Sequence, residues 1–261
     1  MSKSKEIRMQ FEAFAHTDMG PVRENNEDYF LVDQEHGLFV VADGGESGAS
    51  GEVASLIAVK TVEEVLLNEV DPDETRLSRN IMDEEEAIRE RLRYAMSQAC
   101  VKIRHAAVEN PSHRGMGTTL TILLIEDGIA HFSHVGDTRL YLFSNGYLRR
   151  LTRDHTVIQN EIDARRLTPE LARLAPHKNI LTQSVGYHGT VEPVTSTRPV
   201  GEGDILLLCS DGLTDLIGDT SLEELIATTP FGDLAFQLVD RALELGTEDN
   251  VTVIVVKIQE D

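Results

Sequence analysis

The chain of 261 residues is 41% hydrophobic, so it can bury a substantial core, and disorder of the whole chain is disfavoured. Its 45 acidic and 24 basic residues give a formal net charge of -21, which argues against nucleic acid or an anionic membrane surface as the main partner. Aromatic residues make up only 5% and tryptophan is absent, which argues against a surface that stacks bases.

The N-terminal segment and the cysteines bear on location. MSKSKEIRMQF lacks the apolar stretch of a signal peptide, and no run approaches the ~20 apolar residues of a membrane span. Cys100 and Cys209 each lie in an apolar stretch, which is typical of small buried side chains rather than of a disulfide or a metal site. We therefore expect a protein of the reducing cytoplasm.

The first half of the chain combines short strands with two long helices. In chain order, the patterns predict strands at 28–33 and 37–43, a helix at 50–67, a charged loop at 68–80 and a helix at 82–110. The first helix is indicated by one apolar stripe, formed by Ala54, Ile57, Ala58, Thr61, Val62 and Val65. The second carries acids early and bases late, as suits a helix dipole, and Asn110-Pro111 ends it.

The second half contains closely spaced strands interrupted by helices. The patterns predict strands at 119–128, 130–137 and 139–146, an inserted helical segment at 155–179, a strand at 204–211, helices at 220–228 and 231–246, and a strand at 251–258. The turn residues EDG at 126–128 and SNG at 144–146 predict hairpins, so the sheets should be largely antiparallel.

These elements predict an α+β fold. Short antiparallel strands with paired helices indicate sheets packed face to face with helices outside. No linker rich in Gly, Ser or Pro divides the chain, so we expect a single domain over residues 1–261. The helical segment would form a flap subdomain at about 155–180.

Carboxylates mark the ends of several predicted strands. Asp43, Asp137 and Asp211 each end a strand, while Glu27-Asp28 and Glu248-Asp249 each precede one. A single such residue is usually a turn former, but antiparallel sheets can bring strand ends together at one rim. Uncompensated carboxylates gathered there would stay protonated or bind cations. Oxygen ligands without a nearby His/Cys cluster favour Mg²⁺ or Mn²⁺ over Zn²⁺.

The glycines after Asp43 suit such a site. Gly44 and Gly45 let the backbone approach whatever Asp43 holds, and can offer a carbonyl ligand. The loop lacks the G-K-[ST] ending of a nucleotide-binding P-loop.

The chain resembles the metal-dependent (PPM, type 2C) serine/threonine protein phosphatases, bacterial branch. The resemblance covers nearly the whole chain and rests on motifs that occur in order: TDMGPVRENNED (17–28), VVADGG with GEVAS (40–55), GMGTT (115–119), HVGDTRLY (134–141), LTRDHT (151–156), NILTQSVG (179–186), GDILLLCSDGLTDLI (203–217) and EDNVTVIVV (248–256). It implies a four-layer fold, a central antiparallel β-sandwich flanked by helices on both sides.

The resemblance also implies the site and its chemistry. Two Mn²⁺ or Mg²⁺ ions would be bound, with Asp43 bridging both, the Gly44 carbonyl on one, and Asp211 and Asp249 on the other. Glu27 and Asp28 would hold metal-bound waters, Asp137 and Asp215 a third, weaker metal, and Arg23 the substrate phosphoryl group. A metal-held hydroxide would then attack phosphorus directly. The implied partners are proteins phosphorylated by a serine/threonine kinase, and a monomer is expected.

The sequence departs from the family in two places. Many eukaryotic members carry a histidine, proposed as general acid, where this chain has Gly45. A metal-bound water is our candidate for that role. Gln183-Ser184 stands where relatives often have an arginine and a small residue, so local pairing there should differ.

Two other functions are alternatives to an active phosphatase. A catalytically weak or dead relative could bind phosphoproteins as a regulatory module, but Asp43, Asp211 and Asp249 are all present. A two-metal phosphodiesterase would need a site open to polyanions, which a net charge of -21 disfavours.

The flap differs in charge from the rest of the chain. Residues 149–178 hold seven basic and four acidic residues, a net charge of about +3 in a very acidic protein. Charges on solvated helices explain most of these residues. Arg165 and Arg166 are the candidates for a substrate-attracting role, since a basic flap beside the metals would steer a phosphorylated segment to them.

Overall fold

Two antiparallel sheets form the centre of the computed structural model, which describes residues 10–45, 50–67, 84–172, 175, 179–187 and 189–259. One sheet has the order β1 (Gln10–Asp18), β10 (Val251–Gln259), β9 (Ile205–Cys209), β6 (Arg139–Ser144) and β7 (Tyr147–Arg150). The other has the order β2 (Asp28–Asp33), β3 (Leu38–Asp43), β4 (Leu120–Glu126), β5 (Ile129–Val135) and β8 (Val194–Pro199).

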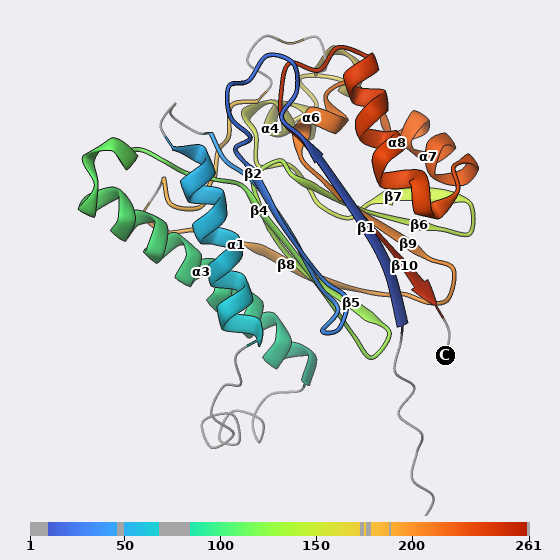
Figure 1. The fold of residues 1–261 in the computed structure, drawn as a ribbon, viewed down its shortest axis with the longest axis horizontal. Helices are drawn as coiled ribbons and strands as arrows, with labels where there is room; N and C mark the ends of the chain where they lie inside the picture. The colour runs from blue at the N-terminus through green and yellow to red at the C-terminus, as the bar shows by residue number, and fades with distance from the viewer. Residues whose placement is uncertain are drawn as a thin grey trace, which may run out of the picture.

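Helices cover the outer face of each sheet (Figure 1). The long helices α1 (Gly51–Leu67) and α3 (Glu84–Glu109) pack on the β2–β8 sheet, and α7 (Asp219–Thr228) and α8 (Phe231–Glu244) pack on the other. The shorter elements are η1 (Pro111–His113), α4 (Val157–Asp163), α5 (Pro169–Ala172) and α6 (Asp211–Thr214). The α+β sandwich flanked by helices is therefore confirmed.

Successive side chains of each strand point to opposite faces of its sheet, and so form three apolar layers between the four layers of helices and sheets. In β3, Val40 packs toward α1 and α3, whereas its neighbour Val41 packs between the two sheets. In β10, Val255 packs toward α8, and Ile254 joins Val41 in the layer between the sheets. All four side chains are fully buried, so a shift by one residue in either strand would put every core side chain on the wrong face.

The predicted strands and helices agree with the structure, and the predicted hairpins have the expected turns. Asp127 and Gly128 have φ of 48° and 76°, and Asn145 and Gly146 have φ of 53° and 82°. Positive φ at both central residues is the primed turn that matches the twist of paired strands. Cys100 and Cys209 are both buried among apolar side chains, as expected.

The predictions omit β1 and β8, and they imply β7 only through the hairpin predicted at 144–146. β1 pairs with β10 from Gln10↔Gln259 to Asp18↔Val251, but only one of its residues is buried. β8, with the sequence VTSTRP, is a polar edge strand beside β5. β8 lacks the apolar content that marks a strand in sequence, whereas β1 carries Phe11, Ala13, Phe14 and Ala15 and was overlooked. The predicted loop at 68–80 lies outside the described residues, as do Arg173 and Lys178 of the flap.

Within the described part of the chain, no helix is both long enough and apolar enough to cross a bilayer.

Candidate active site

The register of the β2–β3 hairpin places two acids opposite each other, Asp28 and Asp43. The backbone of Asp43 is fixed by the GMGTT segment: its N–H donates to Thr119 Oγ1 at 3.0 Å, and its carbonyl accepts from Thr118 Oγ1 at 2.8 Å. The next residue, Gly44, lies so close to the first residue of α1 that a Cβ atom on it would come within 2.1 Å of the Gly51 carbonyl oxygen. Asp43 is thus held at the junction of β3, β4 and α1.

Ser210 joins the second sheet to this hairpin. It directly follows β9, and its Oγ accepts from Thr252 N at 2.9 Å while donating to Asp28 Oδ2 at 2.8 Å. The other carboxylate oxygen, Asp28 Oδ1, is buried and has no hydrogen-bond partner among the described residues. A buried oxygen without a donor is costly, and a cation or a cation-bound water would satisfy it.

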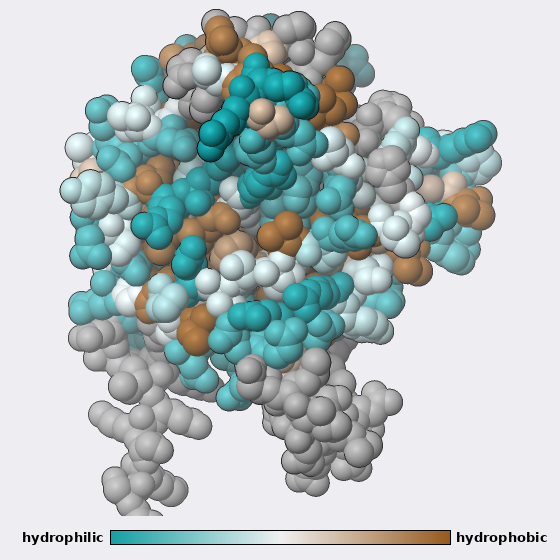
Figure 2. Space-filling view, turned by 180° about the vertical axis from the view of Figure 1, so that it is seen from behind, coloured by the Kyte–Doolittle hydropathy of each residue, from teal (hydrophilic) through white to brown (hydrophobic). Residues whose placement is uncertain are grey.

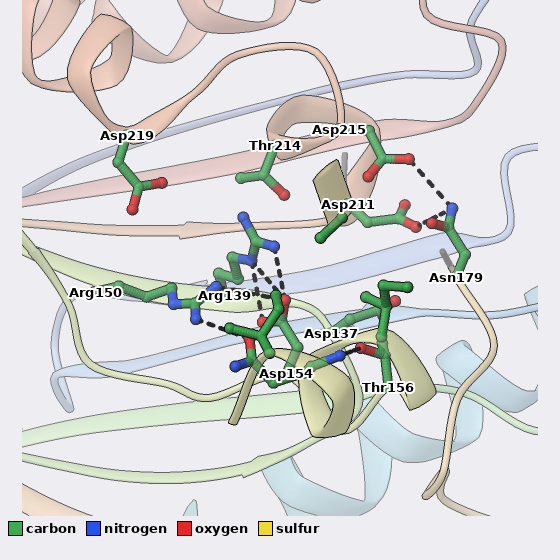
Figure 3. Close-up of a pocket in the computed structure, with 14 residues that line it drawn as sticks. Asp137, Arg139, Arg150, Asp154, Thr156, Asn179, Asp211, Thr214, Asp215 and Asp219 are labelled. Carbon is green, nitrogen blue, oxygen red and sulfur yellow. Dashed lines mark hydrogen bonds and ion pairs between the residues drawn. The ribbon is translucent and has the colours of Figure 1, made fainter. Parts of the chain in front are cut away.

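Helix α6 brings two further acids, Asp211 and Asp215, to the rim of the sandwich, the edge at which Asp28 and Asp43 lie. The helix begins at Asp211, directly after Ser210. A Cβ on Gly212 would lie 2.0 Å from the Asn250 carbonyl oxygen, so only glycine allows α6 to pack against the turn that carries Asp249. Asp215 lies one helical turn after Asp211, as predicted, and both accept hydrogen bonds from Asn179 Nδ2, at 3.0 Å to Asp211 and 3.2 Å to Asp215 (Figure 3).

The carboxylates predicted at the strand ends interact strongly with one another. Burial raises the pKa of Asp43 well above its usual value, and the charges of Asp28, Asp211, Asp137 and Asp249 raise it further. Burial and the neighbouring acids likewise raise the pKa of Asp211. Burial raises the pKa of Asp28 to about 6. The rim therefore holds more negative charge than it can stabilise alone.

Asp137 lines a cavity of about 280 Å³ (Figure 3). Burial and the nearby Asp154 raise its pKa to about 7, while Arg139 acts in the opposite direction. Arg139 forms a two-point ion pair with Asp154: its Nε lies 3.0 and 3.2 Å from the two carboxylate oxygens, and its Nη2 lies 2.6 Å from Oδ2. Arg150 Nη1 lies 3.4 Å from the same carboxylate. The cavity thus has the ion pairs of Asp154 at one side and the acids Asp211 and Asp215, which share Asn179, at the other.

The loop at 19–27 carries Arg23 and Glu27 to the same rim. Arg23 Nη2 lies 2.7 Å from Asp249 Oδ2, and 46% of its side chain is exposed. Burial raises the pKa of Glu27, and the charge of Glu52 adds to this effect. Arg23 is therefore the cation that faces the acidic rim from outside.

The two flap arginines do not contact these acids within the described residues. Arg166 forms a two-point ion pair with Glu161, at 2.6 and 2.7 Å. Arg165 has a φ of 56°, and its side chain is exposed. Arg153 pairs with Asp163 in the same segment. Much of the positive charge counted in the flap is thus neutralised locally.

Sequence reasoning missed several polar residues that hold the site. They are Thr118, Thr119, Asn179, Ser210 and Asn250. All five lie inside the quoted motifs, but nothing in the sequence gives their partners. The departure at Gln183-Ser184 leaves Ser184 Oγ buried without a hydrogen-bond partner among the described residues, while Gln183 Oε1 accepts from Glu192 N.

Comparisons with known proteins agree on one family. The model of the protein phosphatase 2C family matches residues 22–244. Protein phosphatase PhpP of Streptococcus pneumoniae is 33% identical over 249 residues, which cover 94% of this chain and 96% of the relative. The structure of serine/threonine phosphatase Stp1 from Staphylococcus aureus has a TM-score of 0.87 at 28% identity and covers 99% of both chains. The catalytic domain of serine/threonine protein phosphatase PstP in complex with two manganese ions has a TM-score of 0.83 at 31% identity, covering 97% of this chain and 100% of that one.

Proposed function

Because the chain belongs to the protein phosphatase 2C family, in its bacterial PPM branch, we propose that it is a metal-dependent phosphatase of phosphoserine and phosphothreonine in proteins. Its similarity to the PhpP, Stp1 and PstP phosphatases over almost their full catalytic length supports this activity. The observation that carries the proposal is the rim of buried carboxylates, whose raised pKa values and unsatisfied Asp28 oxygen match a site that binds divalent cations.

Two divalent cations would be held by the side chains of Asp43, Asp211 and Asp249 and the carbonyl of Gly44, with Glu27 and Asp28 acting through water. Within the described residues, no three His, Cys, Asp or Glu side chains are arranged as a complete metal site. Backbone oxygens and water would therefore supply the remaining ligands, as is common for Mn²⁺ and Mg²⁺. Bound cations would supply a water of lowered pKa and neutralise phosphoryl oxygens.

Arg23 would bind the phosphoryl group. Its guanidinium can donate to two phosphoryl oxygens at once, and it is exposed at the edge of the rim. A phosphoryl group would compete with Asp249 for it, and a cation on Asp249 would favour that exchange. Water would attack phosphorus directly, and no phosphorylated side chain would form. Gly45 offers no proton donor, so the leaving group takes its proton from water.

The third cation and the flap are finer parts of the proposal. Asp137 and Asp215 would bind an additional cation loosely at the cavity in Figure 3. Asp215→Asn should then reduce turnover of a phosphoprotein and leave two Mn²⁺ ions bound. Density for only two ions near the rim in crystals soaked in high Mn²⁺ would remove this assignment. Arg165 and Arg166 would steer the phosphorylated segment across the flap.

The substrates would be proteins phosphorylated by a serine/threonine kinase. The phosphatase domain would act on them as a monomer. The surface in Figure 2 shows apolar residues in small groups among hydrophilic ones, which suits a monomer on that face. A catalytically dead binding module is not favoured, because the acids at the rim are complete.

The test compares three phosphate esters, with and without metal. The metal-stripped protein should release phosphate from a phosphothreonine peptide and from p-nitrophenyl phosphate only after Mn²⁺ is added. The bis(p-nitrophenyl) ester should react much more slowly. Faster hydrolysis of the bis ester would indicate a phosphodiesterase, and binding of the peptide without turnover would indicate the binding module.

A further inference from the structure

Asn250 is buried at the turn before β10, with 3% of its surface exposed, and its side-chain amide is bound at both ends. Its Oδ1 accepts from Glu27 N at 2.8 Å. Its Nδ2 donates to the carbonyl oxygens of Met19 at 2.8 Å and Asn25 at 3.0 Å. Both amide donors are therefore used, and one side chain holds the start and the end of the segment that contains Arg23.

Other hydrogen bonds of this segment lie near its two ends: Gly20 N donates to Asp18 Oδ1 at 2.7 Å, and Asn26 Nδ2 donates to Thr17 Oγ1 at 2.9 Å. Among the described residues, no backbone–backbone hydrogen bond involves residues 19–26. The Asn250 amide thus replaces the ladder or turn bonds that usually fix a loop. Two other contacts bring the loop to the same turn. A Cβ on Gly20, whose φ is +74°, would lie 2.3 Å from the Asp249 carbonyl oxygen, and Arg23 Nη2 lies 2.7 Å from Asp249 Oδ2.

The chemistry proposed above needs Arg23 and Asp249 at a fixed separation. Arg23 is the phosphoryl ligand and Asp249 a metal ligand, and they come from positions 226 residues apart. Asn250 follows Asp249 directly, so the turn that positions the acid also positions the loop of the arginine. Small errors in such a separation are costly, since a displacement of about 1 Å can reduce turnover by about a hundredfold.

We propose that Asn250 is the positioning residue for Arg23: it holds the loop at 19–27 on the turn of Asp249, so that the phosphoryl-binding guanidinium is preset against the metal ligands. This inference rests on the proposed phosphatase function. Asn250 itself touches neither the substrate nor a metal in this role, and acts only through the loop.

The variants separate this role from general stability. Asn250→Ala removes all three side-chain bonds, and Asn250→Asp keeps the shape and the acceptor for Glu27 N while losing both donors. Gln34→Ala is the matched control, because the Gln34 amide binds Ala13 N at 3.1 Å and joins the β2–β3 turn to β1, whereas the rim lies at the opposite ends of these strands. The substitutions are made in wild-type protein and in Arg23→Ala.

In the wild-type background, Asn250→Ala should raise both KM for a phosphothreonine peptide and the inhibition constant of inorganic phosphate by about tenfold. Mn²⁺ affinity measured by calorimetry should change by less than about threefold. In the Arg23→Ala background, Asn250→Ala should raise KM by less than about twofold, because the residue it positions is already gone. Gln34→Ala should leave KM unchanged in both backgrounds.

Hydrogen exchange gives a readout that does not depend on turnover. Asn250→Ala and Asn250→Asp should speed amide exchange in residues 19–27 and leave β9 unchanged. Three results would each overturn the inference. They are a rise in KM that is equal in both backgrounds, a loss of Mn²⁺ affinity as large as the rise in KM, and unchanged amide exchange in residues 19–27. Absence of phosphate release by the wild-type protein would instead overturn the phosphatase proposal.

Discussion

Ser210 Oγ donates a 2.8 Å hydrogen bond to Asp28 Oδ2 and so joins the end of β9 in one sheet to the start of β2 in the other. The same hydroxyl accepts from Thr252 N at 2.9 Å, so it bonds both the neighbouring strand β10 and the Asp28 carboxylate. This bond sets how the two sheets meet at the acidic rim.

Loss of that hydroxyl should destabilise the protein. Ser210→Ala leaves Thr252 N and Asp28 Oδ2 without their partner in a buried place, which we expect to lower the free energy of unfolding by about 1–3 kcal/mol. Denaturant unfolding at pH 7 without metal measures this. Ser112→Ala is the control, because its hydroxyl bonds Asn110 at an exposed turn. Equal midpoints for both variants would show that the sheets meet without help from Ser210.

The metal-free protein should lose stability as the pH rises from about 4 to about 7. In the unfolded chain an Asp carboxyl ionises near pH ~4. In the folded protein, burial raises the pKa of Asp28 to about 6 and of Asp137 to about 7. Between these values the folded state binds more protons than the unfolded state, so the free energy of unfolding falls with rising pH.

Thermal unfolding between pH 4 and 8, with and without Mn²⁺, measures this dependence. Mn²⁺ should abolish the decline, because a cation replaces the protons between the carboxylates. Asp137→Asn should make the metal-free protein more stable at pH 7 than the wild type. A melting temperature that rises steadily from pH 4 to 7 without metal would contradict the clustering of charge at the rim.

Removal of a central ligand should abolish turnover and preserve the fold. Asp43→Ala and Asp211→Asn each take a negative charge from the proposed cation site, and we expect kcat to fall by more than about a thousandfold. Asp33→Ala, at the other end of β2, is the matched control. Circular dichroism checks the fold. Activity of either rim variant within about tenfold of wild type would remove that residue from the site.

Charge reversal on the flap should affect peptides more than small esters. Arg165→Glu plus Arg166→Glu should raise KM for a phosphopeptide and barely change p-nitrophenyl phosphate hydrolysis, since the small ester needs only the cations and Arg23. The effect should weaken with added salt. Arg198→Glu plus Arg241→Glu is the control: it changes the net charge equally, and Arg241 pairs with Glu244 as Arg166 pairs with Glu161. Equal effects of both double variants would leave the flap without a specific role.

Short apolar runs and turn residues predicted most of the fold. Buried strands such as β3 and β10 are almost continuously apolar, and the turns at Asp127-Gly128 and Asn145-Gly146 need residues that tolerate positive φ. β8 could not be predicted in the same way, because an edge strand that buries little needs no apolar pattern. Its pairing with β5 is a tertiary effect.

The acids of the site could be predicted, but their supporting residues could not. Asp43 and Asp211 stand out because acids recur at the ends of several predicted strands, although a single one would be an ordinary turn former. Ser210 and Asn250 look like ordinary turn residues, and their partners Asp28 and Glu27 lie 182 and 223 residues away. Such bonds follow from how the two sheets pack, which local sequence does not encode.

The most direct test titrates Mn²⁺ into the metal-stripped protein while phosphate release from a phosphothreonine peptide is followed in the same sample. The account predicts that calorimetry detects at least two Mn²⁺ ions per chain and that turnover appears as those sites fill. Asp43→Ala should show both weakened binding and no turnover. Phosphate release at full rate in the presence of a chelator, or from Asp43→Ala, would contradict the metal-dependent mechanism.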